Sequence, residues 1–182
     1  FYTVALELPG LTVSGERMSD RASAEQLKEA CQGAAVTIKK VECKEKSEKP
    51  PALYDLTTLQ RDANRLLGFT AQQTLDYLQS LYEKKLCTYP RTDSRYLTSD
   101  MADSLPVLVN LVANAMPFRK GIAITCDFHA VINDKKLTDH HAVIPTRNRK
   151  DADLSALKEK EKAVLELVAL RLLCAVAQPH IY

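Results

Sequence analysis

Several features that would assign the chain to a common class of protein are missing. No uninterrupted apolar run approaches about 18 residues, so the sequence predicts no transmembrane helix. Residues 1–8 read as a strand and not as the charged and apolar regions of a signal peptide. A P-loop, a GxGxxG motif, an internal repeat and an acidic triad for a two-metal site are also absent. These absences argue against a membrane protein and against the common nucleotide-binding folds.

Cysteines in a pairing pattern are missing too. The chain has five cysteines, an odd number, and none forms a CxxC pair; they are Cys31, Cys43, Cys87, Cys126 and Cys174. This arrangement disfavours a disulfide framework or a zinc ribbon and is typical of a protein in the reducing cytosol. We interpret the five thiols as small and mostly structural hydrophobes.

Strong charge of either sign is absent. The formal net charge is +2 at pH 7, which permits a nucleic-acid partner without arguing for one. The 182 residues, 46% of them hydrophobic, can bury one core or one core with an additional lobe. The chain has no initiator methionine and closes inside an apolar segment, so we expect a fragment of a longer protein.

The first part of the chain is expected to be rich in β-structure. Alternating apolar residues over 1–15, interrupted at Pro9-Gly10, predict a β-hairpin. The capping-box sequence that begins at Ser23 predicts a helix that ends at Gly33. Apolar positions over 35–43 predict another strand, and Pro50-Pro51 then predicts a domain boundary.

Helices are expected in the middle of the chain. Capping-box sequences begin at Thr57 and Thr70, and Gly68 ends the first of the two helices. The second helix has an apolar stripe that includes Leu75, Leu78, Leu81 and Tyr82. The pair resembles a helix–turn–helix, but its exposed residues are not basic, so we interpret it as a corner of a helix bundle.

Two further helices are expected in the second half. One is predicted from Thr98 to Pro117, with Pro106 kinking it or delaying its start. Residues 119–137 read as irregular. The last helix is predicted from Ser155 to about Ala177 by its apolar positions.

A tyrosine followed by two arginines stands between the helical regions. The sequence is Tyr89-Pro90-Arg91-Thr92-Asp93-Ser94-Arg95. A free phenol has a pKa of about 10, and a nearby guanidinium both favours the phenolate and neutralises a phosphate. The pattern is therefore what a tyrosine nucleophile for phosphate needs. The alternative on residue types alone is a surface loop with a tyrosine at the edge of the core.

Two adjacent histidines follow in the sequence Asp139-His140-His141-Ala142-Val143-Ile144-Pro145-Thr146. Histidines in a loop can serve as metal ligands, but neighbours in sequence rarely point at one metal. No cysteine or carboxylate stands at a spacing that would complete such a site. A histidine that contacts phosphate or handles a proton is the other interpretation.

Together, the tyrosine and histidine segments resemble those of type IA DNA topoisomerases. The run 81–94 is similar to the family's active-site region, and 139–146 is similar to its histidine segment in the form typical of bacterial topoisomerase III. Residues 56–60 and 67–70 also match the helices that precede the family's tyrosine. The resemblance is strong over roughly residues 53–147 and weaker in the flanks.

The resemblance implies a role for each residue of the two motifs. Tyr89 would attack a phosphodiester of single-stranded DNA and hold the 5′ end as a phosphotyrosine, so that a strand passes and the break reseals without ATP. Arg91 would contact the scissile phosphate. His140, rather than His141, would lie near the DNA. The residues expected to order the loop and to contribute to DNA binding are Thr92, Asp93 and Ser94.

The resemblance also implies an α+β architecture and a missing half. A mainly helical tyrosine domain (52–150) would be inserted into a β-rich arch domain, to which 1–51 and the helix of 151–182 belong. The family's catalytic glutamate and Mg²⁺ site lie in a toprim domain that precedes this region. We find no such constellation in these residues, so we expect Mg²⁺ only in the parent enzyme, no metal site or cofactor here, and no DNA relaxation by the fragment alone.

The expected partners are single-stranded DNA and the rest of the topoisomerase chain, without a membrane. The protein is expected to be monomeric and to reside in the bacterial cytoplasm, associated with the nucleoid. Two other functions stay open: a non-catalytic module that binds single-stranded DNA, and a helix pair that docks a protein partner. Oligonucleotide titrations at several salt concentrations separate them.

Overall fold

The computed structural model describes residues 1–115, 125–137, 139–150 and 152–182. Contacts within the chain divide it into two units, Phe1–Lys44 and Glu45–Tyr182. In the described ranges, helices are combined with two small antiparallel sheets, as the α+β class predicted. The insertion of a helical domain into an arch domain stays a prediction. No helix in these ranges has the length and apolar character that a membrane span requires.

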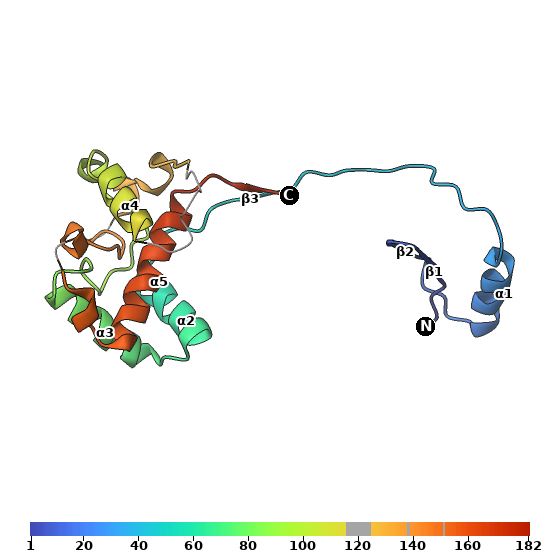
Figure 1. The fold of residues 1–182 in the computed structure, drawn as a ribbon, viewed down its shortest axis with the longest axis horizontal. Helices are drawn as coiled ribbons and strands as arrows, with labels where there is room; N and C mark the ends of the chain where they lie inside the picture. Colours follow the sequence, from blue (N-terminus) through green and yellow to red (C-terminus); the bar gives the residue numbers. More distant parts are fainter. Residues whose placement is uncertain (116–124, 138, 151) are drawn as a thin grey trace. The chain divides into compact units, whose positions relative to one another are not determined.

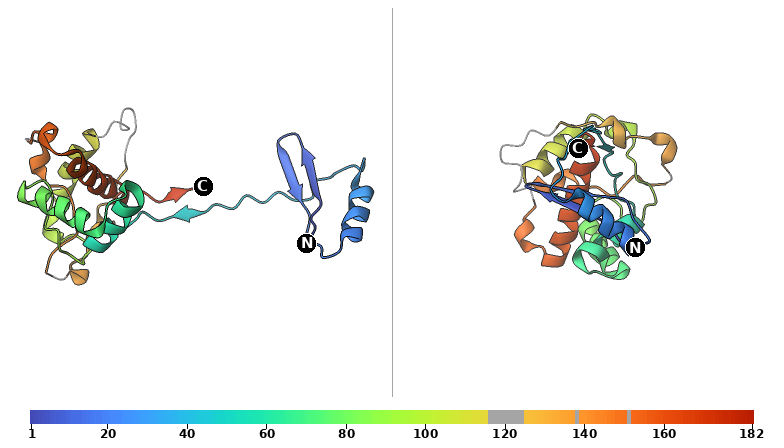
Figure 2. Two further views of the ribbon diagram at one scale, coloured as in Figure 1. Left: turned by 90° about the horizontal axis from the view of Figure 1, so that it is seen from below. Right: turned by 90° about the vertical axis from the view of Figure 1, so that its right-hand side faces the viewer.

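The first unit contains the predicted hairpin. Strands β1 (Ala5–Leu8) and β2 (Leu11–Ser14) pair antiparallel, with Leu8 opposite Leu11 (Figure 2). Gly10 in the turn has φ 76°, a left-handed conformation that costs glycine little. The sequence therefore predicted this hairpin and its turn correctly.

Two predictions in the first unit are wrong. Helix α1 (Arg21–Cys31) begins before the expected Ser23 because Asp20 is its N-cap, and an Asp20 carboxylate oxygen accepts a hydrogen bond of 2.9 Å from the Ser23 N–H. No regular structure forms over the predicted strand 35–43. Its apolar side chains are exposed, so the alternation that predicted a strand is not used to cover a core.

The second unit is built from four helices in the described ranges (Figure 1). A two-stranded ribbon, β3 (Ser47–Glu48) with β4 (His180–Ile181), joins the start of the unit to its end. The helices are α2 (Leu56–Leu67), α3 (Ala71–Glu83), α4 (Leu105–Asn114) and α5 (Glu159–Ala175). Short 3₁₀ turns lie at Ser99–Met101, His129–Val131, Asp134–Lys136, Arg147–Lys150 and Leu154–Ala156.

Local capping chemistry sets the ends of α2 and α3. Asp55, not the predicted Thr57, caps α2, because its carboxylate accepts a hydrogen bond of 2.6 Å from the Thr58 N–H. Gly68 ends α2 in a left-handed conformation, as predicted. The capping box of α3 is confirmed: the side chains and main chains of Thr70 and Gln73 exchange hydrogen bonds of 3.0 and 3.1 Å.

The later helices are shorter than expected. Helix α4 begins at Leu105, with Pro106 in its first turn, where the missing N–H costs nothing. The prediction that Pro106 delays this helix is confirmed, whereas its expected extension to Pro117 falls outside the described residues. Helix α5 runs from Glu159 to Ala175, since residues 154–156 form a separate 3₁₀ turn.

Two apolar clusters share α5. The first half of α5 packs with α2 and α3 around Tyr54, Leu59, Leu78 and Leu81, and the second half packs with α4. The extended segment 142–144 runs between the clusters: Ala142 and Ile144 belong to the α4 cluster and Val143 to the other. Because side chains alternate along an extended chain, this segment fixes the position of its neighbours on both sides.

Candidate active site

The end of α3 directs the chain toward Tyr89. Lys85 adopts a left-handed conformation with φ 59°. The Leu86 N–H donates to the Leu81 carbonyl and the Lys85 N–H to the Tyr82 carbonyl, each at 2.8 Å, which is the Schellman arrangement. Leu81 and Leu86 are both buried in the cluster around α3. The turn therefore ends the helix and places residues 86–88 in an extended conformation.

Thr88, which precedes the tyrosine, is paired with the histidine segment. Its N–H donates to the Ile144 carbonyl at 3.0 Å, and its hydroxyl donates to the Ala142 carbonyl at 3.1 Å. The same hydroxyl oxygen accepts from the Ile144 N–H at 3.0 Å. Thr88 thus holds the segments before Tyr89 and after His140 side by side.

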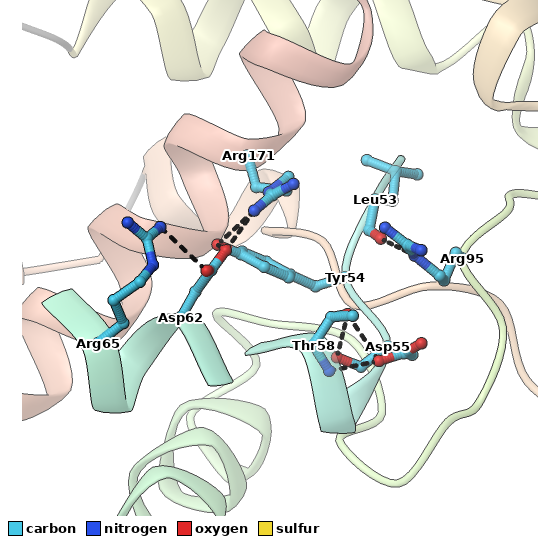
Figure 3. A network of polar contacts seen from close by, with 8 residues as sticks. All are labelled: Leu53, Tyr54, Asp55, Thr58, Asp62, Arg65, Arg95 and Arg171. Carbon is cyan, nitrogen blue, oxygen red and sulfur yellow. Dashed lines mark hydrogen bonds and ion pairs between the residues drawn. The ribbon is translucent and has the colours of Figure 1, made fainter. Parts of the chain in front are cut away.

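The loop after Tyr89 is held by two buried hydroxyls. Thr92 Oγ1 donates to the His140 carbonyl at 3.0 Å and accepts from the Ser94 N–H at 3.1 Å. The Ser94 hydroxyl reaches the Lys136 carbonyl at 3.3 Å. Arg95 Nε donates to the Leu53 carbonyl at 3.1 Å, so the second arginine of the motif is used to fix the backbone (Figure 3).

The ring of Tyr89 lies against two other rings. The His140 ring centroid is 4.2 Å away, with 40° between the planes. The Tyr82 ring, at the end of α3, is 5.5 Å away at 85°. His141 is oriented differently, because its Nδ1 lies 2.8 Å from the Ala142 carbonyl oxygen. The geometry therefore brings together Tyr89 and His140, the pair that the two sequence motifs singled out.

A cleft of about 650 Å³ opens beside His140, whose ring lies against that of Tyr89. Its wall is formed by the start of α2, the tyrosine loop and the histidine segment: Asp55, Leu56, Thr57, Arg91, Thr92, Asp93, Asp139 and His140. Arg91 is exposed and, within the described part of the chain, has no hydrogen-bond or ion-pair partner. Its guanidinium is thus free to meet an anion that enters the cleft, while Thr92 is buried and serves the loop.

Cys87, two residues before the tyrosine, does not compete as a nucleophile. The side chain is fully buried, and burial raises the pKa of its thiol to about 12. The neighbouring Arg149 is also buried, and desolvation lowers the pKa of its guanidinium. A neutral, inaccessible thiol agrees with the interpretation of this cysteine as a structural hydrophobe.

Ionic contacts tie α2 to α5. The Tyr54 hydroxyl donates to Asp62 at 2.8 Å, and Arg171 of α5 binds both groups with its guanidinium over the Tyr54 ring (Figure 3). Burial raises the pKa of Tyr54 to about 12, so the phenol keeps its proton and remains a donor. Burial alone would raise the pKa of Asp62, but its hydrogen bonds from Tyr54 and Arg65 and the charge of Arg171 hold it below the ordinary value.

A second ionic contact ties α3 to α5. Glu161 is 4% exposed and accepts from the Ser80 hydroxyl at 2.6 Å and from Lys84 Nζ at 2.7 Å. Burial opposes the charged form, yet these bonds hold the pKa of the Glu161 carboxyl below its usual range. The end of α3, where the chain turns toward Tyr89, is therefore fixed to the start of α5.

Sequence reasoning missed part of this arrangement. Tyr82 was expected in the apolar stripe of α3, but it is 40% exposed and contacts Tyr89 instead of either apolar cluster. The position of Tyr82 near the end of the helix could be read from the sequence. Its contact with Tyr89 could not, because that contact depends on the turn at Lys85. The pairing of Thr88 with Ile144 and the place of Asp55 and Thr57 in the cleft had no sequence signal.

Metal ligands do not gather in the described ranges. No group of three or more His, Cys, Asp or Glu side chains there has the geometry to hold a metal ion. His140 and His141 in particular face different partners, a tyrosine ring and a backbone carbonyl. The interpretation of the two histidines as a metal pair therefore has no support in this geometry.

Comparison with known proteins gives one family. Residues 1–182 match the family described as DNA topoisomerase. DNA topoisomerase 3 of Shouchella clausii is 42% identical over 171 residues, which cover 90% of this chain and 23% of that protein. DNA topoisomerase 3 of Bacillus licheniformis is 41% identical over 165 residues, with 86% of this chain and 22% of that protein covered. The chain thus spans less than a quarter of the length of these relatives.

A solved structure agrees with the sequence matches. Full-length topoisomerase I from Thermotoga maritima superposes with a TM-score of 0.63 and 26% sequence identity. The match covers 98% of this chain and 29% of that one. The resemblance to topoisomerase III that the two motifs predicted is confirmed by the first two relatives.

Proposed function

Because this chain belongs to the DNA topoisomerase family, we propose that Tyr89 is a nucleophile toward a phosphodiester of single-stranded DNA. The phenol loses its proton as its oxygen bonds to phosphorus, the bond to the 3′-oxygen breaks, and that oxygen gains a proton, which leaves a 5′-phosphotyrosine and a 3′-hydroxyl. One phosphodiester replaces another, so resealing after strand passage needs no ATP. The observation that carries the proposal is the Tyr89 ring against His140, beside a cleft that exposes Arg91.

Arg91 is assigned to the scissile phosphate. A guanidinium makes two parallel hydrogen bonds to phosphate oxygens and stabilises the charge that develops on them. The Arg91 side chain lines the cleft and has no ion-pair partner among the described residues, which supports this assignment. His140 is assigned to the DNA next to the tyrosine, and Thr92 and Ser94 act on the DNA through the loop that they hold. Asp93, which also lines the cleft, is assigned to the same DNA-facing loop.

The remaining chemistry is assigned to the parent enzyme. In this proposal a toprim domain would supply the acid that protonates the 3′-oxygen and would hold Mg²⁺, whose charge would offset that of the phosphate. The described residues of this chain offer no ligand cluster for the ion. The 182-residue chain alone is therefore expected to show no Mg²⁺-dependent relaxation, and agarose-gel assays of supercoiled plasmid check this. Relaxation by the purified chain would refute the assignment.

The architecture and location follow the same family reasoning. We assign 52–150 to a tyrosine domain inserted into an arch domain that includes 1–51 and 151–182, in a monomeric enzyme of the bacterial cytoplasm and nucleoid. The β3–β4 ribbon supports the assignment, because it joins residues 47–48 to 180–181 on either side of the helices. Limited proteolysis tests the boundary near Pro51: cleavage there should leave a resistant core in which α5 stays with the other helices, because it packs against α2, α3 and α4.

The role of the nucleophile is tested in the full-length enzyme. Tyr89→Phe should abolish both relaxation and the covalent adduct with labelled single-stranded DNA, because it removes the attacking oxygen and leaves the ring. Tyr96→Phe is the matched control: it removes a hydroxyl from the same loop whose partner is Lys136 at 3.2 Å. The control enzyme should still form the adduct, and an adduct formed by Tyr89→Phe would refute the proposal.

A non-catalytic module that binds single-stranded DNA is the second candidate. It is favoured by Arg91, which is exposed in an open cleft and has no ion-pair partner in the described part of the chain. It predicts that the chain binds oligonucleotides with an affinity that falls as the salt concentration rises. Arg91→Ala should reduce the slope of log affinity against log salt concentration by about the contribution of one phosphate contact. It also predicts that no adduct forms in the full-length enzyme. The adduct assay therefore decides between the two candidates.

A further inference from the structure

Tyr82 occupies an unusual place for an aromatic residue of α3. It lies in the last turn of the helix, is 40% exposed, and belongs to neither apolar cluster. Its ring contact is the edge-on pair with Tyr89, 5.5 Å away at 85°. Neighbouring residues of the same helix, Leu78 and Leu81, are fully buried and carry the packing. The Tyr82 ring is therefore placed against Tyr89 and contributes little to the core.

The two tyrosines differ in how firmly their backbones are held. Tyr82 is in a helix whose end is fixed by the contacts of Ser80 and Lys84 with Glu161. Tyr89 is in an extended loop, and its side chain turns about two torsions. His140 covers the ring at 40° and Tyr82 meets it at 85°, so the two contacts restrict the ring in different directions.

We propose that Tyr82 is a positioning residue that holds the Tyr89 ring in the orientation from which its oxygen attacks DNA, an inference that rests on the proposed role of Tyr89. The interaction needs the ring of Tyr82 and not its hydroxyl. An edge-on aromatic pair is strong enough to raise the population of molecules with the ring in the paired orientation by roughly threefold to tenfold. Loss of the Tyr82 ring should slow cleavage by about that factor, because fewer molecules hold the reactive orientation.

The test uses the full-length enzyme under single-turnover conditions with a labelled oligonucleotide. Tyr82→Leu should lower the rate of adduct formation roughly threefold to tenfold and leave the oligonucleotide Kd within about twofold. Tyr82→Phe, which keeps the ring, should form the adduct at the wild-type rate. Tyr77→Leu is the matched control on α3: Tyr77 pairs with Phe69 at 5.3 Å and should affect stability rather than the cleavage rate.

A second measurement reports on the ring directly. With labelled tyrosine rings, the nuclear Overhauser effect between Tyr89 and His140 should persist in Tyr82→Phe and weaken in Tyr82→Leu. Tyr82→Met replaces Tyr82→Leu if the latter melts more than a few degrees below the wild type.

Two results overturn the inference. One is a wild-type cleavage rate in both Tyr82→Leu and Tyr82→Met. The other is an equal loss of affinity and rate, which would make Tyr82 a base-stacking contact. Either result with Tyr89→Phe still inactive refutes only the positioning role; an adduct in Tyr89→Phe refutes the proposed function.

Discussion

Replacement of Thr92 removes a hydrogen bond that joins the tyrosine loop to the histidine segment. Thr92 is 7% exposed, and its hydroxyl both donates to the His140 carbonyl and accepts from the Ser94 N–H. Thr92→Val keeps the shape and removes both bonds. The buried Ser94 N–H then loses its partner, which costs about 1–3 kcal/mol, while water replaces the bond at the exposed His140. We expect a net loss of about 2 kcal/mol in the free energy of unfolding.

The assay is thermal or urea unfolding of the purified protein, with Thr92→Ser as the control that keeps the hydroxyl. A loss of this size lowers the Tm by about 5–8 °C for a unit of this length. Thr92→Ser should recover most of it, with a small deficit for the lost methyl group. The reasoning is refuted if Thr92→Val melts with the wild type, or if Thr92→Ser is as unstable as Thr92→Val. Either outcome would mean that the hydroxyl is not what joins the tyrosine loop to the histidine segment.

Two further substitutions test the end of α3. Lys85→Gly should raise the free energy of unfolding by about 1 kcal/mol, because glycine adopts the left-handed conformation without the cost that lysine bears; a lower value in urea titrations would contradict this. Glu161→Gln should lower stability by about 2 kcal/mol at pH 7, since Lys84 loses its ionic partner. The folded-state pKa of Glu161 is lowered, so its stabilisation is complete above the usual carboxyl pKa and is lost as the pH falls through the folded value. The difference between wild type and Glu161→Gln should therefore shrink as the pH falls below the usual carboxyl pKa, and a constant difference in acid titrations would show that charge is not involved.

Local structure was predictable where a single residue type decides it. Pro9-Gly10, Gly68 and the Thr70 capping box gave correct turns and helix ends, because few other conformations suit those residues. The starts of α1 and α2 were missed because two capping residues compete. Asp20 and Asp55 each stand three residues before a hydroxyl residue. In both helices the aspartate, which comes earlier in the chain than the predicted cap, is the N-cap.

Long-range structure was predictable only through the motifs. Nothing in the spacing of Tyr89 and His140 says that their rings meet; the family resemblance placed both near the DNA, and the contact follows from Thr88 and Thr92. The strand expected over 35–43 shows the opposite case. Its alternation is real, but a strand needs a partner, and the described chain gives it none.

Ionic contacts fix the rotation of α5 about its own axis, which its apolar residues alone leave poorly defined. Its buried residues face α2 and α3 on one side and α4 on the other, so apolar packing alone discriminates weakly between rotations of the helix. Glu161 near its start binds Lys84 of α3, and Arg171 near its end binds Asp62 of α2. A rotation of α5 would separate Glu161 from Lys84 and Arg171 from Asp62, so the two contacts favour one arrangement of the helix. Because Lys84 and Asp62 lie on the helices that precede Tyr89, the same selection sets where the tyrosine loop leaves the bundle.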